Sequence, residues 1–167
     1  MEQNNYGDIR VENRDRVTRI VINRPDKLNA IRIQTYTELI GALKAADQSP
    51  RCHVIVIEGE GGKFTAGNDL ADLVNVDKQT VMQAVQGIFD TVASLQKPLV
   101  AVVEGVAVGI GTTLLLHCDL VVASTKTQFR LPFANLGVSP EGGASALLPL
   151  AIGEKMAREV LLTGRFF

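Results

Sequence analysis

The sequence has few of the residues that build metal centres and disulfide-bonded scaffolds. Its 167 residues include two cysteines and two histidines. Cys52 and Cys118 lie in or beside apolar runs without CxxC spacing, so we interpret them as reduced core thiols rather than as a disulfide or a metal site. His53 and His117 are also embedded in apolar runs, which argues against a Ser-His nucleophilic triad.

The sequence also lacks an excess of charge of either sign. Lys and Arg total 17, Asp and Glu total 18, and no basic patch stands out. Because nucleic-acid binding needs a concentrated positive surface, no nucleic-acid partner is expected. Residues 1–5 are polar and lack the apolar core of a secretory signal, so we expect a cytoplasmic protein. The length suits a single domain over residues 1–167.

One apolar run, residues 99–116, is long enough to cross a membrane. However, Glu104 lies inside it, and Gly105, Gly109 and Gly111 interrupt it. A carboxylate at the centre of a bilayer costs a few kcal/mol on insertion scales. We therefore interpret the run as a buried strand followed by a buried helix and expect no membrane partner.

The fingerprints of nucleotide-binding proteins and serine hydrolases are incomplete. Gly109 and Gly111 begin a GxGxxG motif, but Leu114 stands where the third glycine belongs. The pair Gly62–Lys63 lacks both the first glycine and the Ser or Thr of a phosphate-binding loop. Residues 143–147 lack the last glycine of a nucleophile elbow. We therefore interpret the glycines of these segments as positions of close packing.

Hydrophobic periodicity predicts an α/β chain. Alternating apolar and polar residues predict strands at 9–12 and 17–22, joined by a hairpin turn. The β-branched run at 54–57 predicts a strand that is covered on both faces. Strands are also expected at 99–103 and 120–123. Apolar residues and local composition predict helices at 33–46, 70–73, 78–95, 109–117 and 154–162.

Two segments carry residues suited to proton abstraction beside a carbonyl group. Glycines join an apolar run at residues 107–113, which predicts a helix opening with backbone N–H groups that can bind an anion. Glu141 is the acidic side chain of residues 133–149, and apolar residues such as Leu136 and Val138 are its neighbours. A polarising N–H site and one base in apolar surroundings suit this chemistry. The alternative for Glu141 is an ordinary surface carboxylate.

Five short motifs follow one another along nearly the whole chain. They are Asn23-Arg24-Pro25 with Leu28-Asn29-Ala30, Phe64-Thr65-Ala66-Gly67-Asn68-Asp69-Leu70, Gly105-Val106-Ala107-Val108-Gly109, Cys118-Asp119-Leu120-Val121 and Leu162-Thr163-Gly164. In their order and spacing they resemble the crotonase (enoyl-CoA hydratase/isomerase) superfamily. The element Ser139-Pro140-Glu141-Gly142-Gly143 is most similar to peroxisomal-type Δ3,Δ2-enoyl-CoA isomerases and their bacterial relatives. This resemblance implies the ClpP/crotonase fold, a superhelix of ββα units.

The resemblance also implies a role for each site residue. The backbone N–H groups of Asn68 and Ile110 would form an oxyanion hole, and Glu141 would be the catalytic base with a pKa raised by desolvation. For residues 65–69 alone, the simpler interpretation is a helix start with Asn68 or Asp69 as its cap. The residues expected to bind the CoA substrate are Lys27, Asn29, Ala30, Thr65, Ala66, Gly67, Asn68, Asp69, Leu70 and Gly109.

The resemblance favours an isomerase that moves a double bond in an acyl-CoA thioester, without a metal or other cofactor. Enoyl-CoA hydratases use two glutamates to activate water, and the matching positions here are Thr113 and Phe133. Hydration or another crotonase-type reaction remains one alternative, and a non-catalytic acyl-CoA-binding subunit is another.

Members of the superfamily usually have about 250 residues or more. The resemblance therefore implies a C-terminal helical region that is missing from these 167 residues. In the family this region covers part of the active site and builds subunit contacts. We accordingly expect the intact protein to be a homotrimer or a dimer of trimers.

Overall fold

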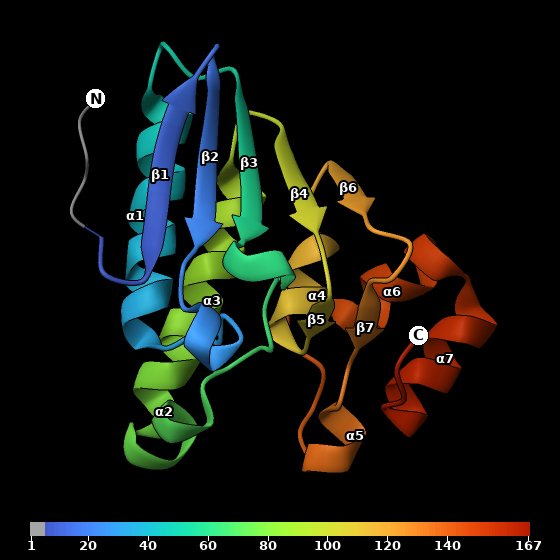
Figure 1. The fold of residues 1–167 in the computed structure, drawn as a ribbon. Coiled ribbons are helices and arrows are strands. Elements are labelled where there is room, and N and C mark those ends of the chain that lie inside the picture. Colours follow the sequence, from blue (N-terminus) through green and yellow to red (C-terminus); the bar gives the residue numbers. More distant parts are fainter. Residues whose placement is uncertain (1–5) are drawn as a thin grey trace.

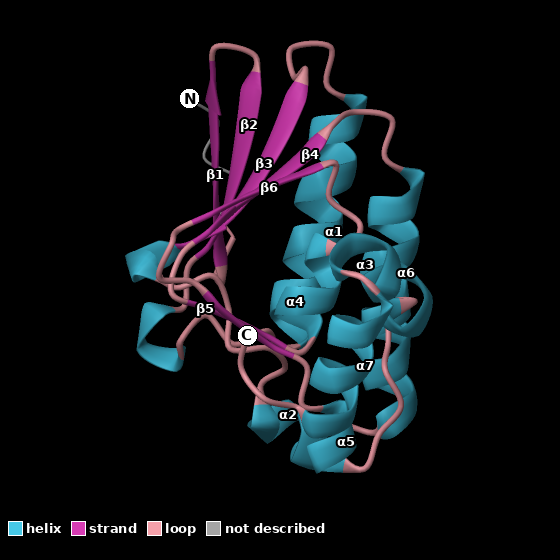
Figure 2. Cartoon of the chain, turned by 90° about the vertical axis from the view of Figure 1, so that its right-hand side faces the viewer, coloured by secondary structure: helices cyan, strands magenta, loops and turns pink. Residues whose placement is uncertain are grey.

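The computed structural model describes residues 6–167, so the expectation about a secretory signal at residues 1–5 lies outside the described part. The chain forms one twisted five-stranded sheet, with helices packed on one of its faces (Figures 1 and 2). A smaller second layer of short strands and helices follows toward the C-terminus (Figure 1). The predicted α/β fold is therefore confirmed.

The five-stranded sheet has the order β1-β2-β3-β4-β6. β1 and β2 are antiparallel, and the other neighbours are parallel. The two residues between β1 and β2, Asp15 and Arg16, both have positive φ, as the tight turn of a twisted hairpin requires. The strands are β1 (Ile9–Arg14), β2 (Val17–Ile22), β3 (Val54–Gly59), β4 (Leu99–Val103) and β6 (Leu120–Ala123).

The main core lies between this sheet and two long helices, α1 (Ile33–Gln48) and α3 (Lys78–Ser94). Ile20 and Ile57 face each other in neighbouring strands and are fully buried. Leu39 of α1 is fully buried in the same cluster. The helical spacing of apolar residues in the sequence therefore identified the face of each helix that packs on the sheet.

The prediction that residues 54–57 are covered on both faces is wrong. Val54 and Val56 are only half-buried, because the long helices of residues 6–167 all lie on the other face of the sheet (Figure 2). Arg19, the partner of Val56 across β2 and β3, forms ion pairs with Glu12 and Glu58 on that face. A continuous β-branched run therefore does not distinguish a covered face from a half-exposed one.

The apolar run at 99–116 contains a strand and a helix, as expected, with one additional short strand between them. It forms β4, then β5 (Val106–Val108), then α4 (Ile110–Leu115). β5 pairs in parallel with β7 (Gln128–Arg130), and the sequence analysis predicted neither of these three-residue strands. No helix described for residues 6–167 combines the length and hydropathy needed to cross a bilayer.

A second core cluster and several shorter helices complete the fold. A second core cluster joins Leu131, Phe133 and Leu148 to Ala157 and Val160 near the C-terminal end. The short helical elements are η1 (Pro25–Lys27), η2 (Glu60–Gly62), α2 (Leu70–Asn75), α5 (Phe133–Leu136), α6 (Ala144–Ile152) and α7 (Glu154–Thr163).

Candidate active site

Two backbone segments, residues 65–68 and 106–111, lie close to each other. The Thr65 N–H donates to the Val106 carbonyl at 3.1 Å, and the Val108 N–H donates to the Thr65 carbonyl at 3.0 Å. These two bonds form a parallel bridge between Thr65 and Ala107. The bridge fixes the register of the Asn68 segment against the segment that leads into α4.

Glycine is required where the two segments touch. A Cβ on Gly67 would lie 2.7 Å from the Val108 carbonyl oxygen, and the φ of Gly67 is +91°. A Cβ on Gly111 would lie 2.4 Å from the Thr65 Cγ2 atom. The interpretation of the glycines in the incomplete motifs as close-packing positions is therefore confirmed at Gly111, but it is wrong at Gly109, where a Cβ would have no neighbour within 4 Å.

The geometry leaves the N–H groups of Asn68 and Ile110 available. Ile31 donates to the Gly67 carbonyl and accepts from the Asp69 N–H, both at 2.8 Å, which makes a second parallel bridge, between Ile31 and Asn68. In such a bridge the Asn68 N–H points away from Ile31. Ile110 is the first residue of α4, where an N–H has no carbonyl one turn earlier to bind. Both N–H groups belong to the two segments that the bridge holds together.

Glu141 lies in the loop between α5 and α6 and is half-buried. Burial raises the pKa of its carboxyl group to about 7, and a hydrogen bond from Thr113 partly offsets this rise. The Thr113 Oγ1 atom lies 3.5 Å from the Glu141 Oε1 atom. Because Thr113 belongs to the same short helix that Ile110 begins, the carboxylate lies beside α4. The expected rise in the pKa of Glu141 agrees with the structure.

Tyr36 binds the Asn68 side chain and is close enough to Glu141 to be affected by its charge. Its buried hydroxyl group donates a hydrogen bond of 2.5 Å to the Asn68 Oδ1 atom. Burial raises the pKa of Tyr36 well above its usual value, and the negative charge of Glu141 adds to this rise. Tyr36 could not be recognised as a site residue from the sequence, because its helical spacing is that of an ordinary core position. Its phenol hydroxyl on a buried face, which requires a partner, was the available signal.

The predicted CoA-binding residues fall into two groups. Asn29 and Thr65 are fully buried, and their side chains are hydrogen-bonded within the protein. The Asn29 Nδ2 group donates to the Lys63 carbonyl at 2.7 Å, and the Thr65 hydroxyl donates to the Asn29 carbonyl at 2.7 Å. These two side chains hold the loop in place, whereas Lys27 and Leu70 are exposed.

Asp69 caps α2, as one interpretation of the sequence expected. Its side chain accepts from the Ala71 N–H at 3.0 Å and pairs with Arg24 at 3.0 Å. Burial alone would raise the pKa of Asp69, but the Ala71 N–H and Arg24 hold it below its usual value. Ala66 donates its N–H to the Leu28 carbonyl at 3.0 Å. Binding of CoA by Ala30, Ala66, Gly109 and the other residues named above stays a prediction.

The apolar residues close to Glu141 in sequence are not all responsible for its burial. Leu136 is 60% exposed and Val138 is 54% exposed. In contrast, a Cβ on Gly142 would lie 2.3 Å from the Phe89 ring, so the backbone beside Glu141 packs directly on α3. Phe133 packs in the second core cluster. Contacts with α3 and α4, which are distant in sequence, therefore make the environment of Glu141 apolar.

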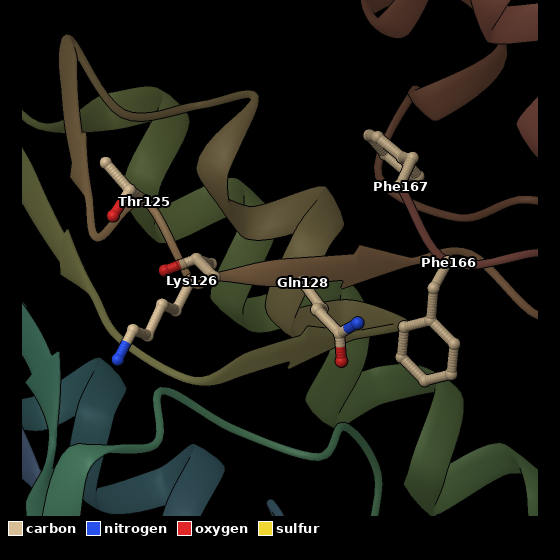
Figure 3. A pocket seen from close by; sticks show the side chains of 6 residues that line it. Thr125, Lys126, Gln128, Phe166 and Phe167 are labelled. Carbon is tan, nitrogen blue, oxygen red and sulfur yellow. The ribbon is translucent and has the colours of Figure 1, made fainter.

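A separate hollow of about 380 Å³ lies between β7 and the C-terminal residues (Figure 3). Residues 125–128 line it together with Phe166 and Phe167. None of the predicted site residues lines this hollow, and Lys126 is its only ionisable side chain. Within residues 6–167, no group of three or more His, Cys, Asp or Glu side chains is arranged to hold a metal ion.

A family model described as enoyl-CoA hydratase/isomerase matches residues 12–167. The chain belongs to the enoyl-CoA hydratase/isomerase family. It is 36% identical to the human protein named enoyl-CoA delta isomerase 2, over 93% of this chain and 41% of that protein. It is 32% identical to crotonyl-CoA hydratase of Syntrophomonas wolfei, over 95% of this chain and 62% of that protein. Membership in the crotonase superfamily is therefore confirmed.

The fold agrees with solved structures of this enoyl-CoA hydratase/isomerase family. The crystal structure of an enoyl-CoA hydratase/isomerase from Pseudoalteromonas atlantica superposes with a TM-score of 0.90 at 35% identity. The match covers 96% of this chain and 64% of the Pseudoalteromonas chain. The chain thus spans less than two thirds of the relatives named here, and the expected crotonase fold is confirmed over that part.

We predict that Gly111→Ala destabilises the protein, because its Cβ would push Thr65 away and separate the two segments. Gly41→Ala is the matched control, since Gly41 also lies in a helix and a Cβ there would have no neighbour within 4 Å. The higher helix propensity of alanine should stabilise the control by about 1 kcal/mol. Urea denaturation measures both variants. Equal stabilisation by the two substitutions would contradict the close approach.

We also predict that Glu141→Gln changes the pH dependence of stability. The folded-state pKa of Glu141, about 7, lies above the ordinary glutamate value of 4.5, so the folded protein binds this proton more tightly than the unfolded chain. Wild-type stability should therefore fall as the pH rises from about 4.5 to about 7. Glutamine does not ionise, so the variant does not lose stability in this way. Its free energy of unfolding should therefore rise relative to that of wild type as the pH rises from about 4.5 to about 7.

Thermal denaturation at pH 5 and pH 8 measures this effect. Glu104→Gln is the matched control, because it makes the same change of charge at an exposed glutamate. A Glu141→Gln variant whose stability relative to wild type is the same at both pH values would show that the carboxylate is solvated.

Proposed function

We propose that the full-length protein is an enoyl-CoA isomerase that moves a double bond from C3 to C2 of an acyl-CoA thioester. The observation that carries the proposal is a half-buried carboxylate, that of Glu141, beside the helix that begins at Ile110, in the segment that the Thr65–Ala107 bridge joins to the Asn68 segment. The human relative named enoyl-CoA delta isomerase 2 supports the same reaction. The substrate class is a CoA thioester, and the mechanism requires no metal or other cofactor.

In the proposed mechanism, the thioester oxygen accepts hydrogen bonds from the N–H groups of Asn68 and Ile110. Negative charge develops on this oxygen when the C2 proton leaves, and each donor would stabilise the enolate by about 2.7–4 kcal/mol. Tyr36 fixes the Asn68 side chain through its hydroxyl group. This contact helps to keep the Asn68 backbone in one orientation before the substrate binds.

Glu141 would remove the C2 proton and return it at C4. The electron pair of the C2–H bond forms the enolate. When the thioester carbonyl re-forms, this pair makes the new double bond between C2 and C3. The electron pair of the former C3–C4 double bond then takes up the proton at C4. One base suffices, because the proton only changes its position along the acyl chain. The raised pKa of Glu141, about 7, makes it a stronger base than a solvated glutamate while it remains partly ionised at neutral pH.

Hydration is the second candidate, and the relative named crotonyl-CoA hydratase is the observation that favours it. The resemblance assigns the two glutamates of hydratases to Thr113 and Phe133 here. Thr113 is fully buried, and Phe133 packs in an apolar cluster, so neither side chain offers a second carboxylate to activate water. These two positions favour isomerisation over hydration.

Assembly into a homotrimer, or into a dimer of trimers, is part of the proposal. β6 is one of the two edge strands of the sheet. Its side chains are exposed, with exposed fractions of 56% for Leu120, 37% for Val121 and 52% for Val122. Clustered exposed apolar side chains of this kind mark surfaces that associate. They support an intact protein in which other chain segments or subunits cover this edge.

We predict that the full-length protein converts 3-hexenoyl-CoA to its 2-enoyl isomer and that Glu141→Gln abolishes this turnover. Glutamine keeps the size and polarity of the side chain but cannot take a proton, so affinity for the CoA ester should change by no more than a few-fold. Ultraviolet absorbance at the conjugated thioester measures turnover, and calorimetry measures binding. Near-normal kcat in the variant would remove Glu141 from the mechanism. Turnover of crotonyl-CoA alone would favour the hydratase.

The rate of isomerisation should rise with pH through about 7, because only the ionised Glu141 can accept the C2 proton. Thr113→Val should move the midpoint of this profile to higher pH, since it removes a hydrogen bond that lowers the pKa of Glu141. Valine has nearly the shape of threonine, so kcat well above the midpoint should remain close to that of wild type. A profile of kcat against pH tests both statements. Loss of all activity in a folded Thr113→Val variant would show that Thr113 has a direct chemical role.

A further inference from the structure

His117 contacts the backbone immediately after Glu141. Its Nε2 atom lies 2.8 Å from the Gly142 carbonyl oxygen. Because a carbonyl oxygen only accepts hydrogen bonds, Nε2 carries the proton and donates it. The imidazole ring also packs on Phe89 of α3, with ring centroids 5.0 Å apart. His117 therefore joins the Glu141 loop to both α3 and the end of α4.

The loop has little freedom at this point. Gly142 has a φ of +56°, and a Cβ there would overlap the Phe89 ring, so the backbone lies directly against this aromatic side chain. The Glu141 carbonyl accepts from the Ala144 N–H at 3.0 Å, and the next carbonyl, that of Gly142, is bound to His117. Two consecutive carbonyl groups are thus anchored, and the second anchor is a side chain from another element.

One segment of chain, residues 110–117, carries three parts of the candidate site beside Glu141. Ile110 provides the oxyanion N–H, Thr113 contacts the carboxylate, and His117 holds the backbone of the carboxylate's loop. Thr113 and His117 are four residues apart, which brings their side chains to one side of a helical segment. Any movement of the Gly142 carbonyl would therefore change the distance between the Glu141 carboxylate and the Ile110 N–H.

We propose that His117 is a positioning residue, which holds the Glu141 carboxylate in register with the oxyanion N–H groups through its hydrogen bond to the Gly142 carbonyl. The effect on catalysis rests on the proposed isomerase function. The effect on the position and burial of Glu141 does not, so the two can be measured separately.

The test compares two variants of the full-length protein. His117→Phe keeps an aromatic ring against Phe89 but cannot donate to the Gly142 carbonyl. His117→Gln removes the ring but retains an N–H donor of similar reach. The pKa of Glu141 is followed by ¹³C NMR of labelled glutamate, assigned by comparison with Glu141→Gln, and kcat and KM are measured with 3-hexenoyl-CoA.

In His117→Phe we expect a pKa of Glu141 shifted toward the value of a solvated glutamate, because the released loop admits water. We expect kcat to fall by about 10- to 100-fold with little change in KM, since displacement by an ångström has effects of this size. His117→Gln should restore both the pKa and most of kcat. Should His117→Phe fail to fold, His117→Asn, whose side chain is too short to reach the carbonyl, replaces it.

Other outcomes overturn the proposal. A lower melting temperature in His117→Phe with unchanged pKa and kcat would show that His117 is merely structural. Equal losses in His117→Phe and His117→Gln would assign the effect to the ring rather than to the hydrogen bond. If wild type does not isomerise 3-hexenoyl-CoA, the proposed function fails, and the NMR titration alone decides whether His117 positions Glu141.

Discussion

The close approach of residues 65–68 to residues 106–111 is the constraint on which the candidate site depends. A parallel bridge between Thr65 and Ala107 sets the register, and Gly67 and Gly111 allow a separation that a Cβ would prevent. This backbone packing holds the segments that carry the N–H groups of Asn68 and Ile110, and the hydrogen bond from Tyr36 to the Asn68 side chain adds to it. The proposed oxyanion site would need little reorganisation when charge develops on the substrate, and such preorganisation is a main source of catalysis.

The second requirement is a carboxylate that is desolvated but not locked into an ion pair. Arg32 and Thr35 bind Asp8, and although burial acts to raise its pKa, these partners keep the pKa below the usual value. Among residues 6–167, the Glu141 side chain has one weak hydrogen bond, from Thr113, and burial therefore dominates its pKa. Asp8 thus stabilises the fold as a permanent anion, whereas Glu141 can exchange a proton near neutral pH.

Much of this arrangement could be predicted from the sequence because it depends on local patterns. Helical spacing identified the long helices, and the glycines of 107–113 together with Glu141 indicated where the chemistry would lie. The two short strands β5 and β7 escaped prediction, because three residues carry too little periodicity. The half-exposed face of β3 was missed because β-branched residues occupy both covered and half-exposed faces of a sheet.

The contacts that complete the site could not be predicted, because they join residues far apart in the sequence. Tyr36 reaches Asn68 and His117 reaches Gly142 across 32 and 25 residues, and neither pair shares a local pattern. Each of these polar side chains occupies a position that could equally belong to an ordinary core. Only the tertiary structure shows that their hydrogen bonds end at the Asn68 segment and at the Glu141 loop.

The central claim is that Glu141 removes a proton from C2 of a bound acyl-CoA. The most direct measurement is proton exchange at C2 of 3-hexenoyl-CoA in heavy water, followed by NMR, with the wild-type full-length protein and with Glu141→Gln. The account predicts that wild type incorporates deuterium at C2 and that the glutamine variant binds the thioester without exchange. Exchange at the wild-type rate in Glu141→Gln, or binding of the thioester by wild type with neither exchange nor isomerisation, would contradict it.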